Sequence, residues 1–305
     1  MRSIVSLAVV SATVFALFML FRPVIGGIGG ATVPDITGRA EPFVPDGATW
    51  LAPFGSLPAP KPVVVASTTK PSPADAAKMG IANLDPVERM ILDLVNAERT
   101  KVQARDLTAE PTLQQIARGH SNDMLARGFF EHVNPDGQAP GDRVAVAHRQ
   151  LIGDAGENIW SGSGIDAADP KKLAELIKSK LMASSGHREN ILKPEYTHIG
   201  IGISVKDKEV RATQVFTVTR GFLDQPLPAQ VATGDTLNLT IKPFAGGQQP
   251  SGYDFLMPNE GTTTGKDYQI GNGKVDIGPG VYKLRFHFPR AGRYSISDGP
   301  QIEVK

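Results

Sequence analysis

The chain contains no cysteine. This absence excludes disulfide bonds, thiolate catalysis and cysteine-ligated zinc, and it also excludes a bacterial lipoprotein anchor, which requires a cysteine after its apolar segment. A charge excess is absent as well, because 32 basic side chains are balanced by 31 acidic ones for a formal net charge of +1. The electrostatics therefore do not indicate nucleic acid or an anionic membrane surface as a partner.

What remains is the composition of an ordinary globular protein. The 305 residues are 41% hydrophobic and 21% charged, which allows a packed core in one large domain or two smaller ones.

The N-terminus has the pattern of a targeting segment. Arg2 precedes an uncharged, mostly apolar run from Ile4 to Phe21, which is long enough to span a bilayer. Small residues up to Ala31 would permit cleavage, so we assign residues 1–31 to a signal peptide or a signal anchor. We expect a secreted or otherwise extracytoplasmic protein that meets the membrane only through this segment.

Residues 32–83 are predicted to form a proline-rich linker. Ten of the chain's 24 prolines fall between Pro23 and Pro73, with Ser, Thr, Ala and Gly among them. Such a segment buries too little apolar surface to offset the entropy of ordering it, so we expect an extended tether.

Residues 84–223 are predicted to fold as an α+β domain. Asp85 is placed to cap a first helix, a second helix is expected from Pro111 to Arg127, and a third begins at Asp169. The alternating runs "HIGIGISV" and "RATQVFTVTRGF" then predict an antiparallel hairpin. Helices combined with a hairpin indicate a layered α+β architecture.

Residues 229–305 are predicted to form a small Ig-like β-sandwich. The segment "DQPLPAQ" indicates a linker before them, and short strand candidates then alternate with Gly, Pro and Asn. No catalytic grouping is evident in this part. His287 lies in an alternating strand and is interpreted as a sheet residue whose hydrogen bonds are satisfied.

Three polar stretches in the middle of the chain resist an explanation by packing alone. His132 lies in "FFEHVNPDG", Glu157 in the small-residue loop "DAGENIWSG", and His187 in the first turn of a short helix "SSGHRENIL" that Ser185 would cap. Two histidines and a carboxylate can converge as metal ligands or as an acid/base pair. They can equally be buried polar residues that tie loops together. Spacing alone does not decide between these readings.

Four motifs occur in an order that resembles a known family. They are "LVNAER", "ARGHSNDMLARGFFEHVNPDG", "GENI" and "SSGHRENILKPEYTHIGIGI". Together they resemble the bacterial branch of the CAP superfamily, the cysteine-rich secretory, antigen 5 and pathogenesis-related proteins, also called SCP-like. The resemblance runs from about Leu84 to Phe222. It implies an α-β-α sandwich with a shared cleft of two histidines and two glutamates.

The resemblance also assigns the cleft residues. His132 and His187 match the two histidines, which hold a divalent metal in some members, so zinc or another divalent metal is the implied cofactor. Glu157 matches the glutamate of the "GEN" motif. The second family glutamate is replaced here by Ser184, and Glu189 is the nearby carboxylate that remains as a candidate for the cleft. No catalytic residue is assigned.

The stretch around His187 carries two further expectations. The positive end of the helix dipole should keep its imidazole neutral and able to bind metal. Arg188 and Asn190 are expected to clamp neighbouring loops.

The function implied by the resemblance is that of an exported binding protein. Its cleft would hold a divalent metal and an extracellular ligand, namely a lipid, a peptide or a cell-wall component. Two alternatives stay open: a metal-assisted hydrolase that uses the same cleft, and a structural cell-envelope protein whose polar cluster only stabilises loops.

Overall fold

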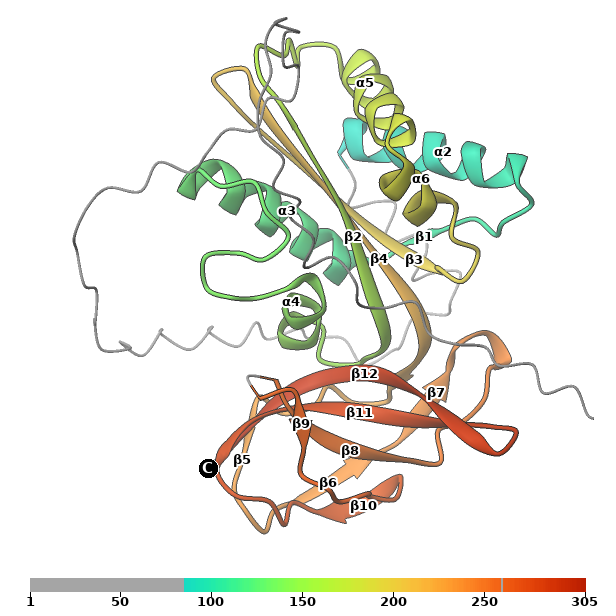
Figure 1. Ribbon diagram of the computed structural model, residues 1–305, viewed down its shortest axis with the longest axis vertical. Helices are drawn as coiled ribbons and strands as arrows, with labels where there is room; N and C mark the ends of the chain where they lie inside the picture. Colours follow the sequence, from blue (N-terminus) through green and yellow to red (C-terminus); the bar gives the residue numbers. More distant parts are fainter. Residues whose placement is uncertain (1–84, 259) are drawn as a thin grey trace, which may run out of the picture. The chain divides into compact units, whose positions relative to one another are not determined.

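The computed structural model describes residues 85–305 except Asn259, all within one compact unit (Figure 1). The predictions for residues 1–31 and 32–83 lie outside the described residues. Among the described residues, no helix is long and apolar enough to cross a membrane.

The three long helices begin where the sequence predicts. They are α2 (Pro86–Lys101), α3 (Pro111–Arg127) and α5 (Pro170–Ala183). The side chain of Asp85 accepts a hydrogen bond from the backbone N–H of Glu88, and the Glu88 carboxylate accepts one from the N–H of Asp85. This reciprocal capping box satisfies two N–H groups that would otherwise have no partner at the helix start.

The central sheet has the strand order β1-β3-β4-β2. Strands β3 and β4 form the predicted hairpin, β2 pairs antiparallel with β4, and β1 runs parallel to β3. Their bounds are β1 (Thr108–Ala109), β2 (Leu151–Gly162), β3 (His198–Lys206) and β4 (Glu209–Leu223).

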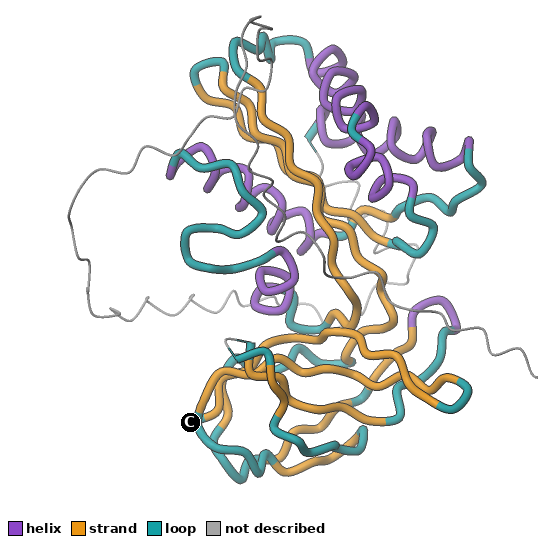
Figure 2. Tube along the Cα trace, in the orientation of Figure 1, coloured by secondary structure: helices purple, strands orange, loops and turns teal. Residues whose placement is uncertain are grey.

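Helices cover both faces of this sheet (Figures 1 and 2). Helices α2 and α5 and the short α6 (Ser185–Leu192) pack on one face, whereas α3 and α4 (Pro140–Ala147) pack on the other. The alternation of isoleucine and glycine in "HIGIGI" follows from this arrangement. Ile199 and Ile201 enter the core beneath α2 and α5, whereas a Cβ on Gly200 or Gly202 would overlap the backbone of α3. These glycines let α3 lie directly on the sheet, and the α-β-α arrangement results.

Glu157 lies in strand β2, so its prediction as a loop residue was wrong. The strand was missed because Gly153, Ala155 and Gly156 hide its alternation of polar and apolar side chains. Small residues are required at these positions, since a Cβ on Gly153 would meet the backbone of β4 and one on Gly156 would meet the ring of Tyr196. The residues that weaken the strand signal are therefore those that let the strand pack.

The residues after β4 form strands and one short 3₁₀ helix, and no α-helix is found among those that the structure describes. One sheet has the order β5-β12-β11-β8-β9, and a second pairs β10 with β6. The all-β content agrees with the sequence, whereas the Ig-like assignment stays a prediction. The elements are β5 (Gln230–Val231), β6 (Thr236–Leu239), β7 (Ile241–Pro243), η1 (Phe244–Gly246), β8 (Gly252–Met257), β9 (Thr262–Thr263), β10 (Gly271–Lys274), β11 (Gly280–Arg290) and β12 (Arg293–Val304).

The boundary between the two predicted domains is bridged by backbone and side chains. Strand β7 pairs with the end of β4, so part of the C-terminal segment joins the central sheet. Ile152 and Leu223 lie in the hydrophobic cluster of the C-terminal strands, and Arg149 donates a hydrogen bond to the carbonyl of Gln301. The boundaries 84–223 and 229–305 describe two kinds of secondary structure, and their independent folding stays a prediction.

Candidate functional site

Glu157 is the centre of a buried polar cluster. Strand β2 carries its side chain inward, where only 1% of it is exposed. One carboxylate oxygen accepts a hydrogen bond from Nδ1 of His132 at 2.8 Å, and the other accepts one from the guanidinium of Arg143 at 2.6 Å. Both oxygens are thus engaged, and the carboxylate holds an imidazole in place as in the second shell of many metal sites.

Arg143 is the residue of this cluster that the sequence did not reveal. It lies on α4, and one of its terminal nitrogens donates to the carbonyls of His132 at 2.8 Å and Gln138 at 2.7 Å. It therefore fixes the loop that carries His132 as well as the carboxylate that orients it. The one sequence signal for the start of α4 is Pro140, which suits a first helical position, and in the structure the Asp142 side chain accepts from the N–H of Ala139.

His132 presents one ring nitrogen outward. Its side chain is 49% exposed, and its Nδ1–H donates to Glu157. In the neutral ring Nε2 then carries the lone pair that a metal ion would need. The hydrogen bond with Glu157 raises the pKa of His132, while burial opposes this shift. A proton therefore competes for this nitrogen at a higher pH than in an ordinary histidine.

His187 lies close enough to sense the charge on His132. Burial lowers the pKa of His187, and repulsion by a protonated His132 lowers it further. The imidazole is thus biased toward its neutral form, as expected, with burial as the largest cause. The predicted cap was wrong: Ser185 is the first residue of α6, and Ser184 occupies the N-cap position without a capping hydrogen bond from its side chain.

An amide network fixes α6 against β2. Asn158 donates to the carbonyl of His187 at 3.0 Å and to the Gln214 side chain at 3.1 Å. Asn190 donates to the carbonyl of Glu157 at 3.2 Å and to the Asn158 side chain at 3.0 Å. The expected clamping by Asn190 is therefore seen. Arg188 donates only to the carbonyl of Met182, at the end of the preceding helix.

Glu189 takes no part in the cluster's hydrogen bonds. Its side chain is exposed and makes no hydrogen bond or ion pair with another described residue. Its place in the cleft stays a prediction.

His120 adds a third imidazole to the cluster from helix α3. Its Nε2–H donates to the carbonyl of Glu131 at 3.0 Å and lies 3.8 Å from the Glu157 carboxylate. Burial lowers the pKa of His120, and the nearby Glu157 only partly offsets this effect. The ring is therefore biased toward its neutral form, with the lone pair on Nδ1.

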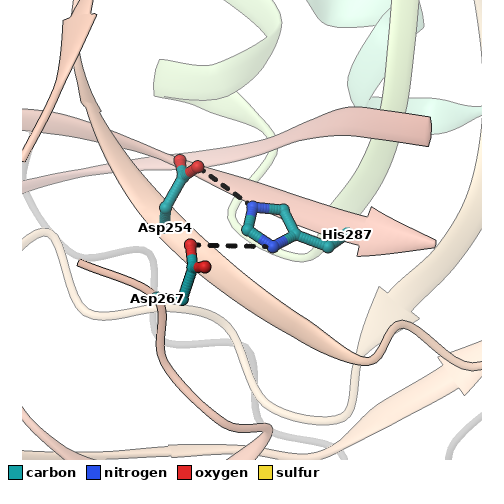
Figure 3. Close-up of side chains that lie close together, drawn as sticks. All are labelled: Asp254, Asp267 and His287. Carbon is teal, nitrogen blue, oxygen red and sulfur yellow. Dashed lines mark hydrogen bonds and ion pairs between the residues drawn. The ribbon is translucent and has the colours of Figure 1, made fainter. Parts of the chain in front are cut away.

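A second group of possible metal ligands lies in the C-terminal strands. Figure 3 shows Asp254, Asp267 and His287, whose candidate ligand atoms lie within 4.8 Å of one another. Nε2 of His287 lies 3.0 Å from Asp254, and its Nδ1 lies 3.9 Å from the exposed Asp267. His287 also stacks on the ring of Tyr294, so its interpretation as a satisfied sheet residue agrees with these contacts.

The chemistry of this second group fits a metal ion poorly. Arg285 donates to both oxygens of Asp254, at 2.8 and 2.7 Å. Burial alone would raise the pKa of Asp254, but the hydrogen bonds from Arg285 and His287 overcome this effect and lower it. A carboxylate already neutralised by a guanidinium is a weak ligand, which leaves His287 and Asp267 as the only strong donors.

The residues around Glu157 lie in a segment that matches a known protein family. Residues 92–219 match the profile of the family described as CAP, cysteine-rich secretory protein family. These residues form a CAP domain.

Two relatives come from Bacillus subtilis (strain 168). Uncharacterized protein YkwD is 33% identical over 144 residues, which are 45% of this chain and 51% of the relative. Uncharacterized membrane protein YlbC is 33% identical over 119 residues, which are 39% of this chain and 32% of the relative. The chain thus spans about half of the first relative's length and a third of the second's.

Among solved structures, an extracellular protein containing a SCP domain from Bacillus anthracis is 27% identical. The match covers 49% of this chain and 45% of that one, with a TM-score of 0.36.

Proposed function

We propose that the chain is an exported binding protein whose CAP-domain cleft holds a divalent metal ion on His132 and His187, and with it an extracellular ligand. The observation that carries this proposal is the hydrogen bond from Nδ1 of His132 to Glu157. A buried carboxylate behind a half-exposed imidazole selects the tautomer that directs Nε2 outward.

The residues present fit a weak, exchangeable metal site. His132 and His187 would supply two nitrogen ligands, whereas both oxygens of Glu157 are engaged by other partners. Two protein ligands leave coordination positions for water or for an oxygen atom of the ligand. A bound metal would supply Lewis acidity and an anchor for a carbonyl, carboxylate or phosphate oxygen.

The hydrolase alternative lacks the second carboxylate of the family pattern in this cluster. Glu157 is fully hydrogen-bonded, and the position of the second family glutamate is Ser184. Binding is therefore the function that the geometry supports best.

Export of the domain is the part of the proposal that depends on the N-terminal sequence. The Arg2-led apolar run up to Phe21 motivates it. Protease added to intact spheroplasts should degrade the CAP domain while a cytoplasmic marker protein survives. Full protection of the domain until the membrane is lysed would contradict export.

Zinc titration tests the cleft. The titration is best done with protein that carries Asp267→Asn. Asp267 is exposed, and its replacement removes a possible metal ligand from the second group. One zinc ion should bind; His132→Gln or His187→Gln should abolish the signal, and Glu157→Gln should weaken binding by about 10–100-fold. Because the pKa of His132 is raised, affinity should already begin to fall above the ordinary histidine pKa as the pH is lowered.

Glu189→Gln is the matched control and should bind zinc like the parent, since this side chain is exposed and takes no part in the cluster's hydrogen bonds. Retention of full zinc affinity by the double histidine variant would favour the structural alternative for the cluster.

A further inference from the structure

A second hollow lies on the α3 side of the CAP domain. It is a groove of about 450 Å³ between α3, the loop after it and α4. Its volume falls in the range of small-molecule sites. Its walls combine apolar side chains, such as Ile116 and Val146, with polar groups from α3 and the loop, including Asn122, Asp123 and Asp136.

Gly119 keeps the groove open. It lies in the interior of α3, where glycine destabilises a helix by about 1 kcal/mol relative to alanine. A Cβ built on Gly119 meets no atom within 4 Å, so packing does not require glycine there. Because Gly119 lines the groove, its missing side chain leaves space that a larger residue would fill.

Arg127 holds two aspartates of the polar wall in place. Arg127 donates to both oxygens of Asp123, with its Nε at 2.6 Å, and to both oxygens of Asp136, at 3.0 and 2.8 Å. Each carboxylate oxygen can accept a further hydrogen bond. Two carboxylates around one guanidinium leave this wall slightly negative, which disfavours phosphates and carboxylates as ligands.

The floor of the groove is formed by His120 and Arg143. It contains one hydrogen-bond acceptor and one donor, each without a partner among the described residues. Within the described residues, Nδ1 of His120 and Nε–H of Arg143 lack hydrogen-bond partners, and both residues line the groove. His120 donates from Nε2, so its Nδ1 can only accept in the neutral ring. A hydroxyl group can donate to His120 and accept from Arg143. Both atoms are buried, so the floor side chains must shift slightly for a hydroxyl to reach them.

We propose that this groove binds a neutral saccharide. Its hydroxyls would donate to Asp123 and Asp136 and pair with the amide of Asn122, while the apolar ring faces pack on Ile116 and Val146. This site is separate from the proposed metal cleft, although Arg143 and His120 both lie against Glu157.

The test is calorimetric titration of the full-length protein with chitotetraose, cellotetraose and maltotetraose, and with putrescine as a cationic probe. At least one tetrasaccharide should bind, and Gly119→Leu should weaken that binding by at least about tenfold because its side chain fills the groove. Gly119→Ala should change affinity less and should raise the melting temperature, because it removes the helix cost of glycine.

Two results would overturn the proposal. One is no binding of any tetrasaccharide at about 10 mM, including the case in which only putrescine binds. The other is saccharide binding that Gly119→Leu leaves at the parent affinity. Zinc titration of Gly119→Leu should match the parent, so a failure of this proposal is distinguishable from a failure of the metal cleft.

Discussion

Replacing Arg143 with methionine should lower the free energy of unfolding by about 3–5 kcal/mol, because it leaves the carboxylate of Glu157 buried without a counter-charge. The two side chains are 9% and 1% exposed, and their atoms lie 2.6 Å apart. The same substitution frees the carbonyls of His132 and Gln138. Urea denaturation measures the loss, and zinc affinity should fall with it because the loop of His132 is released.

Arg127→Met is the matched control for this prediction. Arg127 also bonds carboxylates, but its side chain is 36% exposed, so water replaces the lost interactions and the loss of stability should be much smaller than for Arg143→Met. Combining Arg143→Met with Glu157→Leu should destabilise the protein by less than the sum of the two single substitutions. Strict additivity would show that the pair does not act as a unit.

Replacing Arg99 with methionine should have a comparably large effect, of about 4 kcal/mol or more, because several buried acceptors lose their donor together. Arg99 is fully buried, and burial lowers the pKa of its guanidinium. It donates to the carbonyls of Arg105, Ile191, Lys193 and Tyr196, at 2.8, 2.7, 2.8 and 3.2 Å. These bonds tie the end of α2 to the segment that follows α6.

Thermal and urea unfolding of Arg99→Met measure this effect, with Arg105→Met as the control. The side chain of Arg105 is exposed nearby, and its replacement should change stability by about 0.5 kcal/mol or less. A loss below about 1 kcal/mol for Arg99→Met would contradict the role assigned to the four carbonyls.

The fold of the CAP domain was largely predictable because its signals are local. Caps such as Asp85 and Asp169 and the alternation of β3 and β4 depend on residues close in sequence. Helix α4 has eight residues, which is too short for its apolar period to stand out. Strand β2 was hidden by small residues whose necessity appears only once β4 and Tyr196 are placed.

The candidate site was predictable only in part. His132, Glu157 and His187 were named through a family resemblance, and the structure brings the first two into contact and the third within electrostatic range. Arg143 could not be found, because its role depends on a fold that brings α4 to β2. The clamping role expected of Arg188 belongs instead to Arg99, which lies in the "LVNAER" motif and about 90 residues earlier in the chain.

Strand β12 packs against a strand made much earlier in the chain, and this affects when the protein can fold during its synthesis. Strand β12 contacts β2, and Arg149 bonds the carbonyl of Gln301, 152 positions later in the chain. At about 5–20 residues per second, a ribosome needs on the order of 10–30 s to make the intervening chain. Throughout that interval Ile152 has no finished core to enter, and the same holds for Leu223 once it has been made. We therefore expect the chain to stay incompletely folded until strand β12 has been made, which is the condition a polypeptide needs for threading through a translocation channel.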